Sequence, residues 1–249
     1  MAGSVGEMTS RNVSAGTRLF LAVPAYPASK YHDPSVRPAC VEEGFVEVEV
    51  RHFFLDALGA QRLAPVEVLA VESGMVLLVP GLWNSGPENW QSYWERERGD
   101  CLRVVQSDWE SPQRSDWVAT LERAVSGARE PVVLAAHSLG CCLVAHWAGG
   151  KGASVAKVRG ALLVAPSDVE APSYPAGPVG FGPMPRQRLP FAAAVVASSD
   201  DRFVSLDRAR EFAAAWGARL VEAGALGHIN ADSELGNWPQ GQELLAALL

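Results

Sequence analysis

One serine of this chain stands where a nucleophile could stand. Residues 131–136 are an apolar run, Ser138 follows one residue later, and a second apolar segment begins at Leu139. A strand, a tight turn and a helix in this order would expose the serine hydroxyl above a sheet, where it can attack a carbonyl carbon. The turn needs small residues two positions before and after the serine; Gly140 fits, and Ala136 stands where glycine is more usual. A serine that only caps a helix is the simpler alternative.

The residue types that activate a serine occur later in the chain, in the order that such a site requires. An apolar run over 191–198 ends beside two adjacent aspartates, Asp200 and Asp201, and the run over 219–223 is followed by His228. A histidine can take the proton of the serine hydroxyl, and a carboxylate can hold the imidazole in the required tautomer. His228 could also be an ordinary polar loop residue, but none of the other four histidines follows a late strand. These residues alone leave the choice of aspartate open.

A framework of strands and helices must bring these side chains together. In the last two thirds of the chain, short apolar runs alternate with longer amphipathic segments, which is typical of a parallel sheet covered by helices. We therefore predict an α/β fold. Strands are expected at 75–80, 101–106, 131–136, 158–165, 191–198 and 219–223, and helices near 88–98, 115–127, 139–150, 205–217 and 239–249.

The first 74 residues differ from the rest. They contain none of the eight tryptophans, and they mix Gly, Ser and Pro with stretches of modest hydrophobicity. We expect residues 1–74 to be a poorly ordered or loosely structured extension, dispensable for the folding and activity of residues 75–249. Two runs, at 45–50 and 65–71, alternate like strands and could form a hairpin. The alternative is that they add strands to the edge of the main sheet.

Composition disfavours several classes of function. A net charge of −7 argues against nucleic acid as a partner, because phosphate binding depends on clustered Lys and Arg. No run approaches the roughly 18–20 apolar residues of a membrane span, and the apolar run after Arg18 is short for a signal peptide. The four cysteines fit neither a disulfide framework nor metal spacing, and we expect Cys141 and Cys142 to be packing residues. We expect a cytoplasmic protein that needs no metal or cofactor, with an undetermined oligomeric state.

The sequence also resembles a known family, the small serine hydrolases related to retinoblastoma-binding protein 9 and the bacterial YdeN proteins. The resemblance rests on segments that occur in one order, namely VLLVPGLWNS, DWESP, AAHSLGCC, LLVAPSD, ASSDDRFVS, GHIN and NWPQG. It covers residues 75–249 and implies an α/β-hydrolase fold, in a compact version with a short cap loop. The acidic residue of the family corresponds to Asp201, and Arg202 stands where the family often has proline. Asp200 would then be a turn or capping residue.

The expected reaction is hydrolysis of a small ester or acyl compound through an acyl-enzyme. His228 would accept the proton of Ser138 as the hydroxyl attacks, and Asp201 would orient the imidazole. The oxyanion needs backbone donors, which this fold supplies from the residue after the nucleophile and from the loop after the first strand. These are the N–H groups of Leu139 and Leu82.

A loop rich in Pro and Gly over 166–190 is expected to form a cap, and with Trp83 to line the acyl pocket. The cap residues expected there are Phe181 and Met184 as apolar surface, with Arg186 or Arg188 as anion contacts. The other tryptophans, at 90, 94, 109, 117, 147, 216 and 238, are expected to be core residues. Two alternatives to an esterase stay open. One is a catalytically weak binding protein on a hydrolase scaffold, and the other is a thioesterase or amidase.

Overall fold

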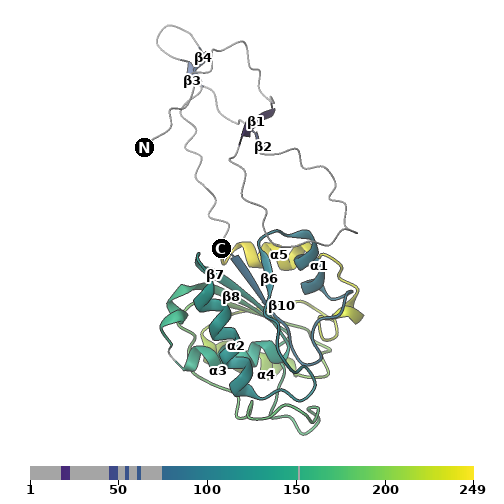
Figure 1. Ribbon diagram of the computed structural model, residues 1–249. Coiled ribbons are helices and arrows are strands. Elements are labelled where there is room, and N and C mark those ends of the chain that lie inside the picture. Colours follow the sequence, from purple (N-terminus) through teal and green to yellow (C-terminus); the bar gives the residue numbers. More distant parts are fainter. Residues whose placement is uncertain (1–17, 23–44, 50–53, 56–60, 63–74, 151) are drawn as a thin grey trace, which may run out of the picture. The chain divides into compact units, whose positions relative to one another are not determined.

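The computed structural model describes residues 18–22, 45–49, 54–55, 61–62, 75–150 and 152–249 (Figure 1). The chain divides into two units, Met1–Leu69 and Ala70–Leu249.

The first unit contains four short described strands. They are β1 (Arg18–Ala22), β2 (Phe45–Glu49), β3 (Phe54–Leu55) and β4 (Gln61–Arg62). β1 pairs with β2 and β3 with β4, both antiparallel, and neither pair belongs to the sheet of the second unit. The strand predicted at 45–50 is therefore present as β2, but its partner is β1; the run at 65–71 lies outside the described residues. That residues 75–249 fold and act without this unit stays a prediction.

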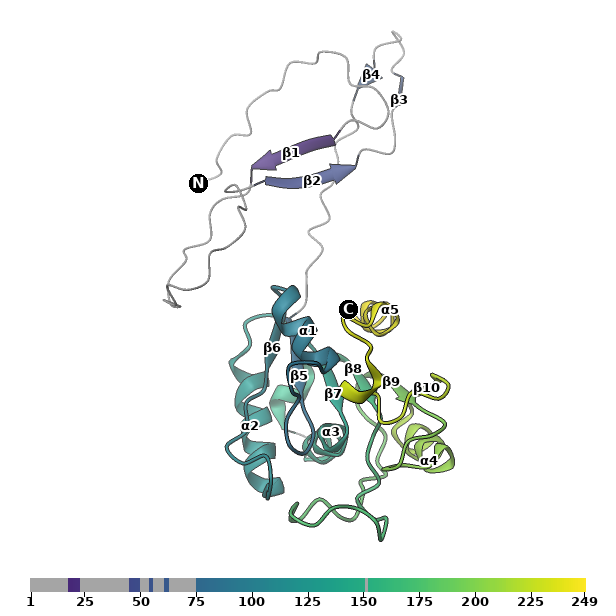
Figure 2. The ribbon, with the colours of Figure 1, turned by 90° about the vertical axis from the view of Figure 1, so that its right-hand side faces the viewer.

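The second unit is built on a six-stranded parallel sheet with the order β10-β9-β8-β7-β5-β6 (Figure 2). The strands are β5 (Met75–Val79), β6 (Cys101–Arg103), β7 (Val132–His137), β8 (Val158–Val164), β9 (Ala192–Ala197) and β10 (Arg219–Glu222). Each lies within or beside a run that predicted it. Every residue of β7 is buried, which explains why its sequence is continuously apolar rather than alternating.

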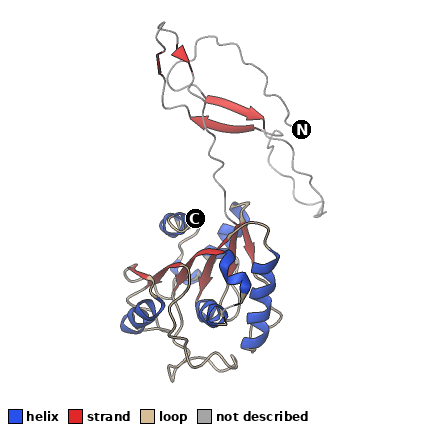
Figure 3. Ribbon diagram, turned by 90° about the vertical axis from the view of Figure 1, so that its left-hand side faces the viewer, coloured by secondary structure: helices blue, strands red, loops and turns tan. Residues whose placement is uncertain are grey.

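Helices cover both faces of this sheet (Figure 3). One layer comprises α2 (Arg114–Gly127), α3 (Leu139–Gly149) and α4 (Leu206–Trp216), and the other comprises α1 (Trp90–Glu97) and α5 (Pro239–Ala246). Two short 3-10 helices, η1 (Ala153–Lys157) and η2 (Ala231–Ser233), lie in the connections. The predicted α/β architecture, a parallel sheet flanked by helices, is confirmed. No helix in the described ranges is long and apolar enough to cross a membrane.

Alternate strand residues supply the two cores. Leu77 and Val79 pack with the layer of α2, α3 and α4, whereas Val76 and Leu78 pack with the layer of α1 and α5. The tryptophans predicted to be core residues are buried, except that Trp109 is half-buried against the core. Trp90 lies edge-on to Trp94 at 4.6 Å between ring centroids, and its indole N–H donates to the carbonyl oxygen of Ile229 at 3.0 Å.

The strand order places a crevice between the ends of β5 and β7. The chain leaves β5 toward one edge of the sheet and leaves β7 toward the other. In open parallel sheets, ligands bind outside the carboxyl ends of the strands where the order reverses in this way. Val79 lies opposite Ala136, so the loops that follow these two strands leave the sheet side by side.

Candidate active site

Ser138 occupies the turn between β7 and α3 in a conformation that most residues avoid. Its backbone has φ of 57° and ψ of −124°, and a positive φ outside glycine costs about 1–3 kcal/mol. The turn is possible because Gly140 lacks a side chain: a Cβ there would lie 2.3 Å from the carbonyl oxygen of Val79. Gly81 is equally close on the other side, where a Cβ would lie 2.6 Å from Cβ of Ser138. This is the tight turn that the sequence predicted.

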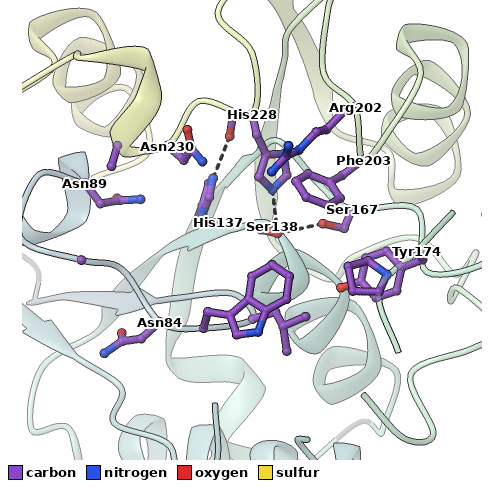
Figure 4. A pocket seen from close by; sticks show the side chains of 15 residues that line it. Asn84, Asn89, His137, Ser138, Ser167, Tyr174, Arg202, Phe203, His228 and Asn230 are labelled. Carbon is purple, nitrogen blue, oxygen red and sulfur yellow. Dashed lines mark hydrogen bonds between the residues drawn. The ribbon is translucent and has the colours of Figure 1, made fainter. Parts of the chain in front are cut away.

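Three side chains from separate loops meet at this turn. The hydroxyl oxygen of Ser138 lies 2.8 Å from Nε2 of His228 (Figure 4). Nδ1 of the same imidazole lies 2.8 and 2.9 Å from the two carboxylate oxygens of Asp201. A carboxylate only accepts hydrogen bonds, so Nδ1 carries a hydrogen, and in the neutral imidazole Nε2 then offers its lone pair to the serine hydroxyl. The Asp201 side chain is 0% exposed, and the structure thus brings together the three residues that sequence analysis selected.

Asp200 hydrogen bonds with groups other than the imidazole. Its Oδ1 accepts hydrogen bonds from the Ser198 hydroxyl at 2.7 Å and from the backbone N–H of Gly227 at 2.8 Å. These bonds, with that of Ser198 the strongest, lower the pKa of Asp200. Asp200 therefore ties its own loop to the residue before His228, and it is Asp201 that contacts the imidazole.

The loop around Arg202 is held without the proline that the family often has there. Oδ1 of Asp201 accepts a hydrogen bond from the backbone N–H of Phe203 at 2.8 Å, and the carbonyl oxygen of Phe203 accepts one from the N–H of Asp168 at 2.9 Å. The centroids of the Phe203 and His228 rings lie 4.5 Å apart. Backbone hydrogen bonds thus replace the stiffness of a proline at this position.

His137 supports the loop that carries His228, a role that could not be predicted from the sequence. Burial, and next the charge of His228, lower the pKa of His137 to about 3. The imidazole is therefore neutral, and its Nε2–H donates to the carbonyl oxygen of His228 at 2.9 Å (Figure 4). Nothing in the sequence around His137 signals this contact, because it joins residues 91 positions apart.

A second hydroxyl reaches the nucleophile. Ser167 follows the end of β8, is 1% exposed, and places its Oγ 2.7 Å from Oγ of Ser138 (Figure 4). No role for Ser167 was predicted from the sequence. The available signals were its position at the carboxyl end of a strand beside β7 and its place in the segment LLVAPSD, one of those that carry the family resemblance.

Two backbone N–H groups near Ser138 are the candidates for oxyanion donors. Leu139 is the first residue of α3, so its N–H has no partner within the helix. Leu82 lies in the loop after β5 and lines the same cavity as Ser138. Neither N–H donates a hydrogen bond to any residue that the structure describes. The N–H of Ser138, in contrast, donates to the carbonyl oxygen of Val164 at 3.0 Å.

A cavity of about 180 Å³ opens beside Ser138. Trp83, whose side chain is among the most exposed apolar ones described, lines it as predicted. Tyr174 and Pro175 from the cap segment and Phe203 also line it, together with polar side chains of Asn84, Asn89, Arg202 and Asn230 (Figure 4).

The other expectations for the cap segment 166–190 were wrong. Phe181 and Met184 do not line the cavity; they are buried in the core, where Phe181 packs against Trp117 at 5.6 Å between ring centroids. Arg186 pairs with carboxylates on the outer surface, and Arg188 is exposed outside the cavity. The apolar residues of the cap pack inward because they complete the core over α2 and α3, which composition alone does not reveal.

Cys141 and Cys142 are fully buried in α3, as packing residues. Burial raises the pKa of both thiols, so both stay protonated near neutral pH. In the described part of the chain, no three His, Cys, Asp or Glu side chains gather as they would around a metal ion.

Comparison with known proteins gives a consistent result. The family model for serine hydrolases matches residues 76–247. A YdeN-like hydrolase from Pectobacterium atrosepticum is 31% identical with a TM-score of 0.62, over 70% of this chain and 89% of that one. The ydeN gene product of B. subtilis is 20% identical with a TM-score of 0.57, over 70% and 98%. A monoacylglycerol lipase from Paleococcus ferrophilus, 13% identical with a TM-score of 0.51 over 71% and 93%, is similar in fold. No curated protein matches the chain.

Proposed function

The chain belongs to the serine hydrolase family, and from this premise we propose that it cleaves a small carboxylic ester with Ser138, His228 and Asp201 as a catalytic triad. The observation that carries the proposal is the continuous contact from the Ser138 hydroxyl through both imidazole nitrogens to a buried carboxylate. A triad is recognised by this geometry and by the roles that it permits. The finer kinship with retinoblastoma-binding protein 9 is part of the same proposal.

In the acylation step, Oγ of Ser138 attacks the ester carbonyl carbon and its proton passes to Nε2 of His228. The resulting imidazolium is stabilised by Asp201. The electron pair of the carbonyl double bond moves to oxygen, where the N–H groups of Leu82 and Leu139 would donate to it. When the intermediate collapses, His228 gives its proton to the departing alcohol, and the acyl group stays on Ser138.

Deacylation repeats these steps with water as the nucleophile. His228 takes a proton from the water as it attacks the acyl-enzyme, and the new oxyanion meets the same two N–H groups. His228 then returns the proton to Oγ of Ser138, and a carboxylic acid leaves. Each step uses side chains and backbone groups that lie at the cavity or directly beneath it.

The cavity favours a short acyl group. Its volume of about 180 Å³ is below the 300–1,000 Å³ that is typical of sites for drug-sized ligands. Trp83 and Phe203 offer apolar surface, and Arg202 alone among the described lining residues carries a fixed charge. These features support a small ester, neutral or with a carboxylate that reaches Arg202, as the substrate.

The alternatives are a thioesterase or amidase and a binding protein with little turnover. The triad alone does not separate ester from thioester, because both give the same acyl-enzyme. A binding protein is disfavoured because all three triad side chains are present and in contact.

A substrate panel tests the function. We expect p-nitrophenyl acetate and butyrate to be hydrolysed best, p-nitrophenyl decanoate at least tenfold more slowly because of the cavity volume, and butyryl-CoA and butyryl p-nitroanilide more slowly still. In the variant Trp83→Ala the ratio of butyrate to decanoate rates should fall, since one wall is removed. Val105→Ala, an exposed apolar side chain outside the cavity, is the control. Faster cleavage of the thioester or the anilide would replace the esterase assignment, and no turnover would favour the binding protein.

A further inference from the structure

The hydroxyl oxygen of Ser138 has two hydrogen-bond partners, and counting hydrogens fixes their directions. In the neutral imidazole that the proposed reaction requires, Nδ1 of His228 carries the hydrogen that Asp201 accepts, so Nε2 has a lone pair and can only accept. The single hydrogen of the Ser138 hydroxyl therefore points to His228. The 2.7 Å contact with Ser167 then requires the Ser167 hydroxyl to donate to Oγ of Ser138.

The surroundings hold Ser167 in this position. Tyr174 lines the cavity together with Ser167, and burial raises the pKa of its phenol, so the phenol keeps its hydrogen. The guanidinium of Arg208 donates hydrogen bonds to both carboxylate oxygens of the next residue, Asp168, at 2.8 and 3.1 Å. Its N–H also donates to the carbonyl oxygen of Phe203. Ser167 thus lies on a segment that is fixed to the same loop as Asp201.

We propose that Ser167 is a fourth catalytic side chain, whose hydroxyl donates to Oγ of Ser138 and aims this oxygen at the substrate. The inference rests on the proposed function. The hydroxyl oxygen of Ser138 has two covalent bonds and two lone pairs. The covalent bonds go to Cβ and to the hydrogen that points to His228, and one lone pair accepts the hydrogen bond from Ser167. The remaining lone pair is the one that attacks, and Ser167 restricts it to a single direction. Orientation of the nucleophile contributes to the reaction rate, because misplacement of a reacting atom by about 1 Å can lower the rate a hundredfold.

The same donor acts when the acyl group leaves. As the bond between Oγ and the acyl carbon breaks, its electron pair returns to Oγ, and negative charge grows there until His228 delivers its proton. A hydrogen bond from Ser167 stabilises this charge, as preorganised donors do at other developing oxyanions. Ser167 keeps its own proton in both steps. Removal of the Ser167 hydroxyl should therefore slow both acylation and deacylation, while the affinity for the substrate changes little.

The experiment measures each step in Ser167→Ala and in the wild-type full chain. Inactivation by a fluorophosphonate reports attack by Ser138 alone, and we expect its rate constant to fall about tenfold to a hundredfold. With p-nitrophenyl butyrate, kcat should fall by a similar factor and KM by less than threefold. Ser167→Thr keeps the hydroxyl and should recover most of the loss. Cysteine is close to serine in size, but its thiol is a weak hydrogen-bond donor. Ser167→Cys should therefore show the same loss as Ser167→Ala, and it replaces Ser167→Ala in the experiment if the alanine variant does not fold.

Ser154→Ala is the matched control. Ser154 is also buried, and its hydroxyl donates a hydrogen bond to Glu122. Ser154 precedes the amino end of β8, whereas Ser138 follows the carboxyl end of β7, so the two serines lie at opposite ends of the parallel strands. Its inactivation rate should equal that of the wild type, even if its thermal midpoint falls as much as that of Ser167→Ala. Inactivation of folded Ser167→Ala or Ser167→Cys at the wild-type rate would overturn the inference and leave the triad intact. A wild-type protein that is not labelled at Ser138 would overturn the proposed function as well.

Discussion

Replacement of Asp201 by asparagine is expected to lower kcat/KM for p-nitrophenyl butyrate by about a thousandfold to ten-thousandfold. Asp201 accepts from Nδ1 of His228 with both carboxylate oxygens. An asparagine amide can instead donate to Nδ1, which moves the imidazole hydrogen to Nε2. Nε2 could then no longer take the proton of Ser138. Steady-state kinetics of the purified variant measure the loss.

Asp200→Asn is the control for this prediction, because it makes the same chemical change one residue earlier. Oδ1 of Asp200 accepts from both the Ser198 hydroxyl and the N–H of Gly227, and the amide oxygen of asparagine can still accept both bonds, which are weaker without the negative charge. We expect a loss of tenfold or less, through a looser loop before His228. A larger loss in Asp200→Asn than in Asp201→Asn would transfer the acidic role to Asp200.

The second large effect is expected in Gly140→Ala. The added Cβ would lie 2.3 Å from the carbonyl oxygen of Val79 and 2.8 Å from that of Pro80, which are backbone atoms that cannot rotate away. Overpacking of this kind costs about 1–3 kcal/mol or more, and each kcal/mol lowers the thermal midpoint by about 2–4 °C in a chain of this size. The turn would also move Ser138 relative to His228. We therefore expect a fall in the midpoint together with a loss of esterase activity of at least a hundredfold.

The control for Gly140→Ala lies at the other end of the same helix. A Cβ at Gly149 would meet only the side-chain oxygen of Gln187, at 3.7 Å. Alanine there should leave activity unchanged and keep or raise the midpoint, because alanine favours a helix over glycine by up to about 1 kcal/mol. Equal effects of the two substitutions would mean that close packing at Gly140 does not support the turn.

The sheet could be predicted from the sequence because its central strands are buried on both faces. Such strands appear as short apolar runs, and the helices between them carry their own periodicity. The prediction was least accurate at the edge of the sheet, where β6 ends at Arg103 and the expected strand ran to 106. Val105 in that run is 68% exposed, so an apolar residue after an edge strand was mistaken for part of it.

The three residues of the proposed triad could be selected from the sequence for a different reason. Its residues follow strands whose carboxyl ends must meet in a parallel sheet, so chain order limits the candidates. His137 and Ser167 were missed because their roles depend on contacts across the site, with a carbonyl oxygen and a hydroxyl, that leave no pattern along the chain. The choice of Asp201 over Asp200 came from the family resemblance, and the structure gives it a physical basis in the hydrogen-bond partners of the two carboxylates.

In the proposed reaction Ser138 is the covalent nucleophile. The mass of the protein after treatment with a fluorophosphonate, followed by mapping of the labelled peptide, tests this role directly. We predict one adduct, on the peptide that contains Ser138, and no adduct in Ser138→Ala with an unchanged circular dichroism spectrum. A folded wild-type protein that carries the label on another residue, or carries no label, would show that Ser138 is not the nucleophile.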